Sequence, residues 1–520
     1  KKLKNETLSL KLRGKDWTSN SETVLKRYEQ FHKAILQYKN EDVFELFMNI
    51  YTGIVDPHTN YFSPEDSDNF RISMSLSLEG IGAQLRSEDD YVTIVGIVPG
   101  GPADKSQKLK EGDRIVAVGQ DDEGEFVDIV GWRTDEAVKL IRGDKGTTVR
   151  MLILPADANI DSKPVEIKLV REKIKLEDQA AQKDTVYIYK DTKLYTIGVV
   201  KVPAFYLDFE GKRKNDPDYK STTKDVKRII EEFKKEGIDG VIVDLRNNGG
   251  GSLLEAVELT GLFIDSGPVV QVKKSDGMIE VDRDIDNSIT WNGPLLVMVN
   301  KNSASASEIF SAAIQDYGRG LIVGEQTYGK GTVQNLIDLS KFVPAEDDNI
   351  GQLKITVAKF YRITGGSTQH KGVVPDIEYP TRYSAEEVGE SSLPSALPWD
   401  QIDPTKFKAV NNFSKSLSDL IKNHSERAKN NIEFQFLLED IEEYNKNKDL
   451  QMVSLNEEKR IQERDEEDAQ KKLRDEQRQQ KLEINIDNVP EVNTKQTKKE
   501  DYLLQESGEI LTDFIQLSKN

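Results

Sequence analysis

Apolar strands and amphipathic helices alternate along the middle of the chain, and this alternation limits the folds that it can adopt. Apolar residues recur at helical spacing within residues 222–236, and the apolar run GVIVDLR follows at 240–246. A helical segment at 253–263, a strand at 294–299, a serine-rich helix start and a strand at 321–324 come next. Strands that alternate with helices pair in parallel through right-handed crossovers. The sequence therefore predicts a layered α/β core.

The serine-rich segment carries the strongest chemical signal. Ser305-Ala-Ser-Glu308, ahead of an apolar run, fits a capping box that opens a helix, and Lys330 follows between two glycines. A serine hydroxyl becomes a good nucleophile when a neighbouring base takes its proton, and a lysine can do this only in its neutral form. Burial would have to lower the lysine pKa from about 10.4 to roughly 7–8. The pattern indicates a serine nucleophile with a lysine base.

Other interpretations of these residues stay open at this level. The capping box has a purely structural role in many helices, although a helix N-terminus also suits a nucleophile because its N–H groups can hold an oxyanion. Ser303 and Ser307 compete with Ser305 as the nucleophile. Of the four histidines, His370 in STQHKG is the realistic alternative base, and a Ser-His-Asp triad built on it is not excluded by spacing. No HExxH or similar ligand cluster occurs, so we expect neither a metal nor a cofactor.

Four motifs resemble those of the C-terminal processing peptidases, and most closely the bacterial tail-specific proteases. They are DLRNNGGG, SASASEIF, GEQTYGKGTVQ and FYRITGGSTQHKGVVPDI, in order within residues 56–380. The resemblance implies a multidomain α/β protein with a crotonase/ClpP-like layered α/β peptidase core and a Ser/Lys dyad. It implies that Ser305 and Lys330 are the catalytic residues and that Gln334 orients the lysine. It also implies that the backbone N–H groups of Ala306 and Gly251 form the oxyanion hole.

The glycines of DLRNNGGG have a physical role in this scheme. Gly251 has no Cβ, so its backbone can approach a substrate closely, and the N–H of Ala306 points to where a carbonyl oxygen becomes charged. A flexible strand-to-helix turn or a phosphate cradle would be the alternatives. No Lys-Ser/Thr pair follows the glycines, which argues against a phosphate-binding loop.

Residues 71–171 read as short strands with glycine turns and one helix near Thr134 to Ile141. This segment resembles a PDZ domain of the bacterial protease type, with a small β-rich domain of another kind as the alternative. A PDZ domain binds a peptide C-terminus as an added strand and reads its last side chain in an apolar pocket. Arg142 is a candidate for coupling this domain to the active site. The expected peptide-binding residues are Gly80, Ile81, Gly82, Ala83, Leu85, Val138 and Ile141.

The flanking segments are expected to be helical. The resulting division is an N-terminal helical region at 1–70, the PDZ domain at 71–172, the peptidase core at 173–382 and a charge-rich helical domain at 383–520. Within the last, residues 457–483 carry mixed charges and almost no apolar face. Such a segment is usually a solvated helix supported by ion pairs, and the alternative is an arm that binds a partner or cups a substrate.

Composition excludes some classes of function. Lys and Arg number 72 against 91 Asp and Glu, a net charge of −19, which is not the basic footprint of a nucleic-acid-binding protein. There is no apolar run of 18 residues, so no transmembrane segment is predicted. The absence of cysteine excludes disulfides but does not fix the compartment. The chain starts KKLKNETLSL with neither Met nor a signal peptide, as a mature or trimmed fragment would. The family resemblance implies a periplasmic, cell-envelope location and a possible adaptor lipoprotein as partner.

We therefore predict a serine endopeptidase that recognises exposed apolar protein C-termini through a PDZ domain. It would cleave envelope proteins by acyl-enzyme chemistry. A PDZ scaffold that binds tails without cutting them is the alternative from another functional class, and acyl transfer on small thioesters is a third possibility that the PDZ-like segment disfavours.

Overall fold

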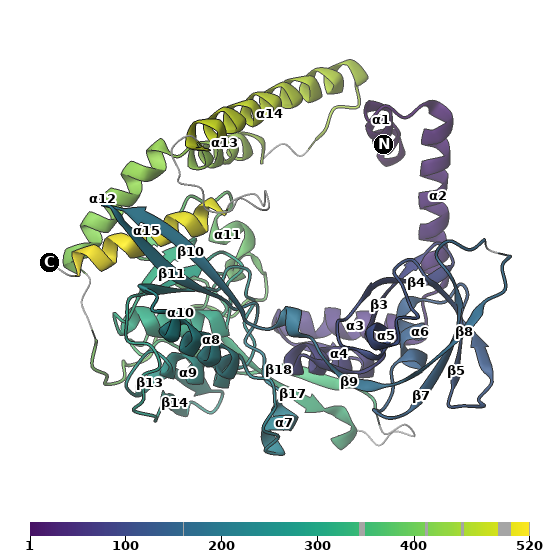
Figure 1. Cartoon of the computed structure of the whole chain (residues 1–520), viewed down its shortest axis with the longest axis horizontal. Helices are drawn as coiled ribbons and strands as arrows, with labels where there is room; N and C mark the ends of the chain where they lie inside the picture. Colours follow the sequence, from purple (N-terminus) through teal and green to yellow (C-terminus); the bar gives the residue numbers. More distant parts are fainter. Residues whose placement is uncertain (160, 343–348, 411–413, 449–451, 487–500, 519–520) are drawn as a thin grey trace.

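The computed structural model describes residues 1–159, 161–342, 349–410, 414–448, 452–486 and 501–518. Figure 1 shows the domain expected to be a PDZ domain on one side, the α/β core on the other, and helices from both chain ends joining them. The predicted parallel α/β core and helical flanks are present.

The core is a six-stranded sheet of order β10-β11-β12-β15-β16-β19. All neighbours from β11 onward pair in parallel, as the alternation of strands and helices predicts, and β10 forms an antiparallel edge. The central strands are buried on both faces because helices cover both. The core strands and helices are β10 Gln182–Lys190, β11 Lys193–Lys201, α7 Phe209–Arg213, α8 Thr222–Glu236, β12 Gly240–Asp244, α9 Leu253–Gly261, β15 Leu295–Val299, α10 Ala306–Asp316, β16 Leu321–Gly324 and β19 Ile377–Glu378.

A second, antiparallel sheet packs beside the first and receives a strand from the N-terminal region. Its order is β1-β18-β13-β14, and β17 also pairs with β18. Residues 60–62 pair with 352–354, so the N-terminal region is part of the same body as the core. The strands are β1 Asn60–Phe62, β13 Gly267–Lys274, β14 Ile279–Asp284, β17 Thr332–Asp338 and β18 Gln352–Tyr361.

The two faces of the parallel sheet are covered by different parts of the chain. Helices α8, α9 and α10 bury their apolar stripes on one face. The other face is covered by C-terminal helices, above all α15, whose Ile510 and Leu511 are fully buried against the sheet. The C-terminal helices are α11 Ala385–Val388, α12 Ser414–Asn430, α13 Ile432–Asn447, α14 Glu457–Ile486 and α15 Tyr502–Leu517.

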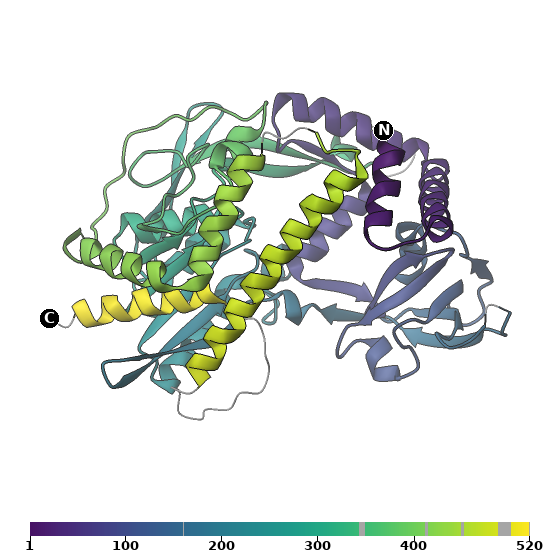
Figure 2. The same ribbon diagram turned by 90° about the horizontal axis from the view of Figure 1, so that it is seen from above.

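Helix α14 is the mixed-charge helix that the sequence predicts, and it spans from the C-terminal helices to the N-terminus (Figures 1 and 2). Arg474 forms ion pairs with Asp440 of α13, and near the other end Arg464 donates to the Leu12 carbonyl at 2.7 Å. Lys11 pairs with Glu457 at 2.8 Å. The helix is therefore solvated along its length and tied to helices at both ends.

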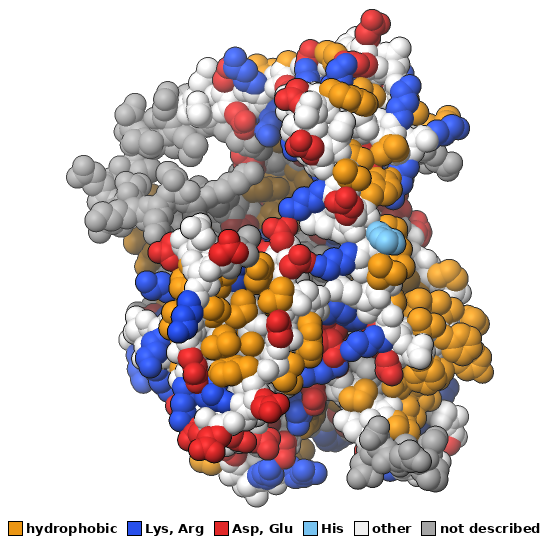
Figure 3. All heavy atoms as spheres, turned by 90° about the vertical axis from the view of Figure 1, so that its right-hand side faces the viewer, with side chains coloured by type: hydrophobic (Ala, Val, Ile, Leu, Met, Phe, Trp, Pro, Cys, Tyr) orange, Lys and Arg blue, Asp and Glu red, His pale blue; other side chains and the backbone are white. Residues whose placement is uncertain are grey.

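The N-terminal helices expose an unusual amount of apolar surface. They are α1 Lys2–Leu12, α2 Trp17–Leu36, α3 Asn40–Val55 and α4 Pro64–Ser75. Phe31 of α2 and Phe47 of α3 are each 64% exposed, and Ile54 is 73% exposed. Figure 3 shows a broad hydrophobic strip on the face that these helices present. No helix among the described residues is both long enough and apolar enough to cross a membrane.

The domain expected to be a PDZ domain is a six-stranded antiparallel sheet that helix α6 packs against. Strand β3 lies at its edge and pairs only with β4 among the described strands. Its elements are β2 Ser77–Gly80, β3 Ala83–Glu88, β4 Tyr91–Ile97, α5 Pro102–Ser106, β5 Arg114–Gln120, β6 Phe126–Asp128, α6 Thr134–Ile141, β7 Thr148–Leu154, β8 Val165–Val170 and β9 Glu172–Lys175, of which β2 and β9 pair with each other outside the six-stranded sheet.

The buried face of α15 generates a stability prediction. Replacing Leu511 with alanine should lower the free energy of unfolding by about 2–5 kcal/mol, because the cavity left against Gly240 and the sheet cannot be filled by water without cost. Thermal and urea unfolding followed by circular dichroism would measure it. Leu473→Ala on the exposed face of α14 is the control, and it should change stability by no more than about 0.5 kcal/mol. Equal effects of the two substitutions would contradict the packing of α15.

Candidate active site

Two turns at the carboxyl edge of the parallel sheet meet at Ser305. One follows β12 and contains the glycine triplet, and the other follows β15 and opens helix α10. The Ala304 N–H donates to the Asn248 carbonyl at 3.0 Å. A Cβ built on Gly250 would lie 2.8 Å from the Ser305 Cβ, so no residue larger than glycine fits there. Neighbouring parallel strands end at the same edge of a sheet, which is why these turns meet.

Ser305 has a strained backbone. Its φ of 58° and ψ of −113° lie in a region that side-chain-bearing residues rarely adopt. The Ser305 N–H donates to Glu308 Oε2 at 2.7 Å, and the Ser305 carbonyl accepts the Glu308 N–H at 2.8 Å. The Glu308 side chain thus makes its half of the predicted capping box and holds the strained residue in place. Strain of this kind is concentrated at functional sites.

The three neighbouring serines have different surroundings. Ser303 and Ser307 are fully buried. The Ser303 hydroxyl donates to the Leu245 carbonyl at 2.8 Å, and the Ser307 hydroxyl donates to the Asn248 carbonyl at 2.9 Å. Ser305 is partly exposed at the start of α10. Of the three, Ser305 is the residue that a substrate can reach.

Glu308 connects Ser305 to the segment of residues 327–331 that carries Lys330, here called the lysine turn. Its carboxylate is fully buried and accepts four hydrogen bonds from two segments of the chain. Oε2 accepts the N–H groups of Ser305 and Lys330 at 2.7 and 2.9 Å, and Oε1 accepts from the Gly329 N–H and the Thr327 hydroxyl at 2.7 and 2.6 Å. Burial raises the pKa of Glu308 to about 7, while these donors favour its ionised form. One side chain thus fixes the backbone of both predicted catalytic residues.

The electrostatic surroundings of Lys330 favour its neutral form. Burial lowers the pKa of Lys330 to about 8, and the positive charge of Lys354 lowers it further. Glu390, Glu308 and Asp56 act in the opposite direction. With a pKa of about 8, about a tenth of the lysine is neutral at pH 7. This is the range that a lysine base requires.

Gln334 lies on β17, beside a β-bulge, and Lys330 precedes this strand. Its side-chain N–H groups donate to the hydroxyls of Thr332 and Thr356 at 2.9 and 3.0 Å. Within the described part of the chain, no hydrogen bond joins Gln334 to the Lys330 ammonium. Its role in orienting the lysine stays a prediction.

The N–H group of Gly251 points away from the neighbouring segment at Phe205. Phe205 forms a parallel bridge with Gly251, in which its N–H donates to Gly250 and its carbonyl accepts from Ser252, at 2.9 and 2.8 Å. In such a bridge the peptide groups of the central residue point away from its partner. The N–H of Ala306, the first residue of α10, belongs to those that a helix leaves without an intrahelical acceptor. Both N–H groups suit an oxyanion hole.

His370, the alternative base, lies next to the lysine turn. Its backbone φ is 63°, and its N–H donates to the Gly329 carbonyl at 2.8 Å. The Nε2 atom is buried without a hydrogen-bond partner among the described residues. No hydrogen bond links it to Ser305 within the same residues, so the structure does not assemble a triad around it.

Comparison with known proteins identifies the family. Models of the peptidase family S41, the PDZ domain, the tail-specific protease N-terminal domain and the C-terminal domain of tail-specific protease match residues 196–379, 69–154, 1–65 and 383–516. The tail-specific protease of Haemophilus influenzae is 40% identical over 99% of this chain and 71% of that protein. The chain belongs to the tail-specific protease family.

More distant relatives agree with this assignment. The carboxy-terminal processing protease CtpA of Bacillus subtilis is 31% identical over 69% of this chain and 69% of that protein. Among solved structures, the photosystem II D1 C-terminal processing protease is 24% identical over 72% of this chain and 92% of that chain, with a TM-score of 0.36. A Vibrio cholerae PDZ domain crystallised with a peptide is 51% identical over 19% of this chain and all of that chain, with a TM-score of 0.19. The match to the peptidase family S41 and the two curated relatives show that the chain is a serine peptidase of the C-terminal processing type.

The PDZ residues expected to bind peptide fall into three groups. Ala83 and Leu85 on the edge strand β3 are partly buried, as is Val138 of α6. Ile81 and Ile141 are only 2% and 3% exposed and belong to the PDZ core. The remaining two, Gly80 and Gly82, lie on either side of Ile81, and Gly82 has a φ of 76°. The groove assignment stays a prediction for all of them.

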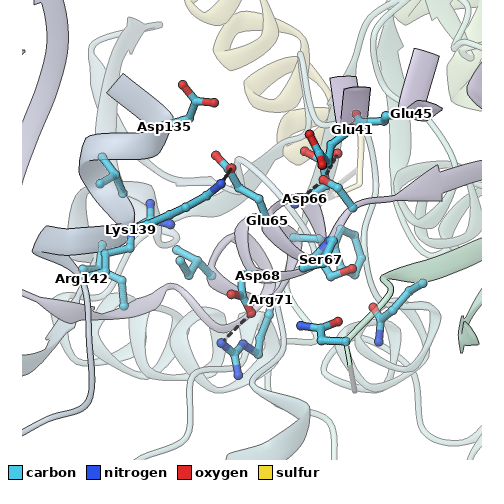
Figure 4. Close-up of a pocket in the computed structure, with 18 of the residues that line it drawn as sticks. Glu41, Glu45, Glu65, Asp66, Ser67, Asp68, Arg71, Asp135, Lys139 and Arg142 are labelled. Atoms are coloured by element: carbon cyan, nitrogen blue, oxygen red, sulfur yellow. Dashed lines mark hydrogen bonds and ion pairs between the residues drawn. The ribbon is translucent and has the colours of Figure 1, made fainter. Parts of the chain in front are cut away.

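A large cavity with a mixed polar and apolar lining lies between helix α6 of the PDZ domain and the N-terminal helices. Its volume is about 2260 Å³, and Val138 lines it, but none of the predicted catalytic residues does. Figure 4 shows Lys139 of α6 reaching Glu65 of α4, with Arg142 just after the end of α6. Lys139 pairs with Glu65 at 3.4 Å, and Arg142 donates to Asn69 at 3.0 Å. The contacts between the PDZ domain and α4 are thus polar and exposed.

Sequence reasoning missed the surroundings of the lysine. The segment ahead of the PDZ domain contributes to them: the charge of Asp56 acts to raise the pKa of Lys330, and His58 contacts Glu390, whose charge also acts on this lysine. His58 and Glu390 are 332 positions apart. Hydrophobic periodicity carries no information on such a contact.

Substitution of Glu308 tests whether this side chain positions the catalytic residues or only stabilises the fold. An amide has one acceptor oxygen in place of two, so Glu308→Gln leaves N–H groups of the dyad segments without partners. We expect kcat to fall about 100-fold, with a stability loss of about 1–3 kcal/mol. Steady-state cleavage of an unfolded protein and thermal unfolding would measure both quantities.

Asp376→Asn is the matched control for this experiment. Asp376 is also a buried carboxylate, and it accepts the Ile322 N–H at 2.8 Å and a Gln315 N–H at 3.0 Å, away from the dyad. Its substitution should lower stability while kcat stays within about two-fold. If both variants lose stability equally and both keep kcat, the positioning role of Glu308 is wrong.

Proposed function

We propose that cleavage uses Ser305 as nucleophile and Lys330 as general base. Neutral Lys330 Nζ takes the hydroxyl proton as Ser305 Oγ attacks the scissile carbonyl carbon. The charged lysine then gives this proton to the leaving amine, which leaves the acyl group on Oγ. Water, deprotonated by the same lysine, attacks the acyl carbon and restores the serine. The N–H groups of Ala306 and Gly251 would stabilise the oxyanion in both halves of the reaction.

The observation that carries this proposal is the shared carboxylate of Glu308. It fixes the backbone of Ser305 and of Lys330 within one buried hydrogen-bond cluster. Burial meanwhile lowers the pKa of Lys330 to about 8, so a neutral fraction exists near neutral pH. A binding scaffold that does not cut has no use for a strained serine beside such a lysine, and the protease relatives also disfavour that alternative.

Substrate selection is proposed to depend on the PDZ domain. The edge strand β3 has a free side for strand addition among the described strands, and a helix lies across from it, as C-terminus recognition requires. The Gly80-Ile81-Gly82 turn would hold the terminal carboxylate. We propose apolar C-termini as the ligands because Ala83, Leu85 and Val138 are apolar and only partly buried.

Location and organisation complete the proposal. The family resemblance supports a periplasmic protein that processes or degrades envelope proteins, with an adaptor lipoprotein as a possible partner. We further propose that the chain divides into four regions: an N-terminal helical region at 1–70, the PDZ domain at 71–172, the peptidase core at 173–382 and a C-terminal helical domain at 383–520. The interlocking of β1 with β18 and of α15 with the sheet supports a core that depends on both flanks.

The choice among the three serines is directly testable. Ser305→Ala should abolish cleavage of an unfolded protein that ends in an apolar residue, with a loss of at least about 1,000-fold. Ser307→Ala removes the hydrogen bond to the Asn248 carbonyl, and Ser303→Ala removes both the bond to the Leu245 carbonyl and the one from the Asn300 N–H. Each lost bond should cost about 0.5–1.5 kcal/mol of stability, and both variants should keep a measurable rate. Mass spectrometry of the fragments and thermal unfolding would give both readouts. Cleavage by Ser305→Ala at the wild-type rate would contradict the proposed nucleophile.

A further inference from the structure

We propose that His58 is a positioning residue for Lys330, and that it acts through the buried carboxylate of Glu390. The proposal rests on the proposed function, because it concerns the lysine of the same dyad. It assigns a role in catalysis to a segment that precedes the PDZ domain and lies outside the core sheet.

The His58–Glu390 contact is buried and short. His58 Nε2 lies 2.8 Å from Glu390 Oε2. The Glu390 side chain is fully buried, and the His58 side chain is 15% exposed. A buried carboxylate without partners is costly, so a ring N–H at this distance gives the Glu390 carboxyl group a hydrogen-bond donor and fixes its orientation.

Glu390 in turn holds the lysine turn from both sides. Its N–H donates to the Tyr328 carbonyl at 2.9 Å. Its Oε1 accepts from Gln369 Nε2 at 2.9 Å, and Gln369 Oε1 accepts the Gly331 N–H at 2.7 Å. Lys330 lies between these two anchored residues. A change in the position of Glu390 would therefore move the lysine relative to Ser305.

Hydrogen bonds also connect His58 to the core. The backbone N–H of His58 donates to Asp56 Oδ1 at 3.1 Å, and Asp56 also accepts from the Thr59 hydroxyl at 3.0 Å. The Thr59 hydroxyl accepts the Thr356 N–H of β18 at 3.2 Å. The Thr356 hydroxyl accepts from Gln334. The segment thus reaches the dyad by two routes, one through Glu390 and one through β18.

The same groups set the charge around the lysine. Negative charges on Asp56, Glu308 and Glu390 face Lys330, and the positive charge of Lys354 comes from β18. The Tyr328 side chain of the lysine turn also faces Glu390 and Glu308. Removing the negative charge of Glu390 should lower the pKa of Lys330, and removing the positive charge of Lys354 should raise it. The two substitutions therefore shift the pH dependence of cleavage in opposite directions.

The test measures kcat and KM of the intact chain on an unfolded protein with an apolar C-terminus, from pH 6 to 9.5. In the wild type, kcat should rise with pH through about 8. His58→Ala should lower kcat about 10–100-fold and leave KM within about two-fold, because a displaced lysine slows chemistry and not binding. His58→Gln can still donate an N–H to Glu390 and should recover most of kcat. His32→Ala, an exposed histidine on α2, should change nothing.

Charge variants provide the second readout. Glu390→Gln should move the rising limb of kcat to lower pH, and Lys354→Gln should move it to higher pH. Thermal unfolding identifies any variant that fails to fold. If His58→Ala fails to fold, the pH dependence of kcat in Glu390→Gln is the remaining test of the proposal.

Three results would overturn the proposal. The first is a His58→Ala variant whose kcat and pH dependence of kcat are both unchanged. If that variant does not fold, the same result in Glu390→Gln takes its place. The second is a His58→Gln variant as inactive as a folded His58→Ala variant. The third is retained cleavage by Lys330→Ala together with its loss in His58→Ala, which would make the histidine the base. Cleavage by Ser305→Ala would instead refute the proposed function, independently of His58.

Discussion

The hydrogen bonds to the Glu308 carboxylate are the interactions on which the rest of the site depends. A buried carboxylate is stable only when donors surround it, and here the donors are the backbone N–H groups of the two segments that carry the serine and the lysine. The side chain that caps α10 therefore also sets the distance between the two segments. The strained backbone of Ser305 persists because this cluster determines it from several directions.

The architecture explains how distant segments reach this cluster. The parallel sheet places the turns after β12 and β15 side by side at one edge, and the antiparallel sheet delivers β17 and β18 to the lysine. Strand β1 adds the N-terminal region to this second sheet, and α15 seals the far face of the first. A charged lysine is disfavoured in such surroundings because little water reaches it, and this lowers its pKa.

The local patterns of the sequence predict the elements but not all of their neighbours. Helical spacing in residues 222–236 and the capping box at Ser305 both correspond to structure, because each depends on residues within a few turns. The contact of His58 with Glu390 depends on chain segments 332 positions apart, and no local pattern encodes it. In the PDZ domain, apolar residues such as Ile81 fit either a core or a groove by sequence, and here Ile81 is buried in the core. Burial also separates Ser305 from Ser303 and Ser307, which the sequence alone leaves equivalent.

The central claim is that Lys330 is neutral often enough to act as a base, and its titration tests this most directly. Protein labelled with ¹⁵N at lysine side chains would be titrated by NMR, and the Lys330 signal would be assigned by its loss in Lys330→Ala. The account predicts a midpoint of about 8, well below the ordinary lysine value. A midpoint near 10.4 would mean that the lysine stays charged throughout the neutral range, and it would contradict the proposed dyad.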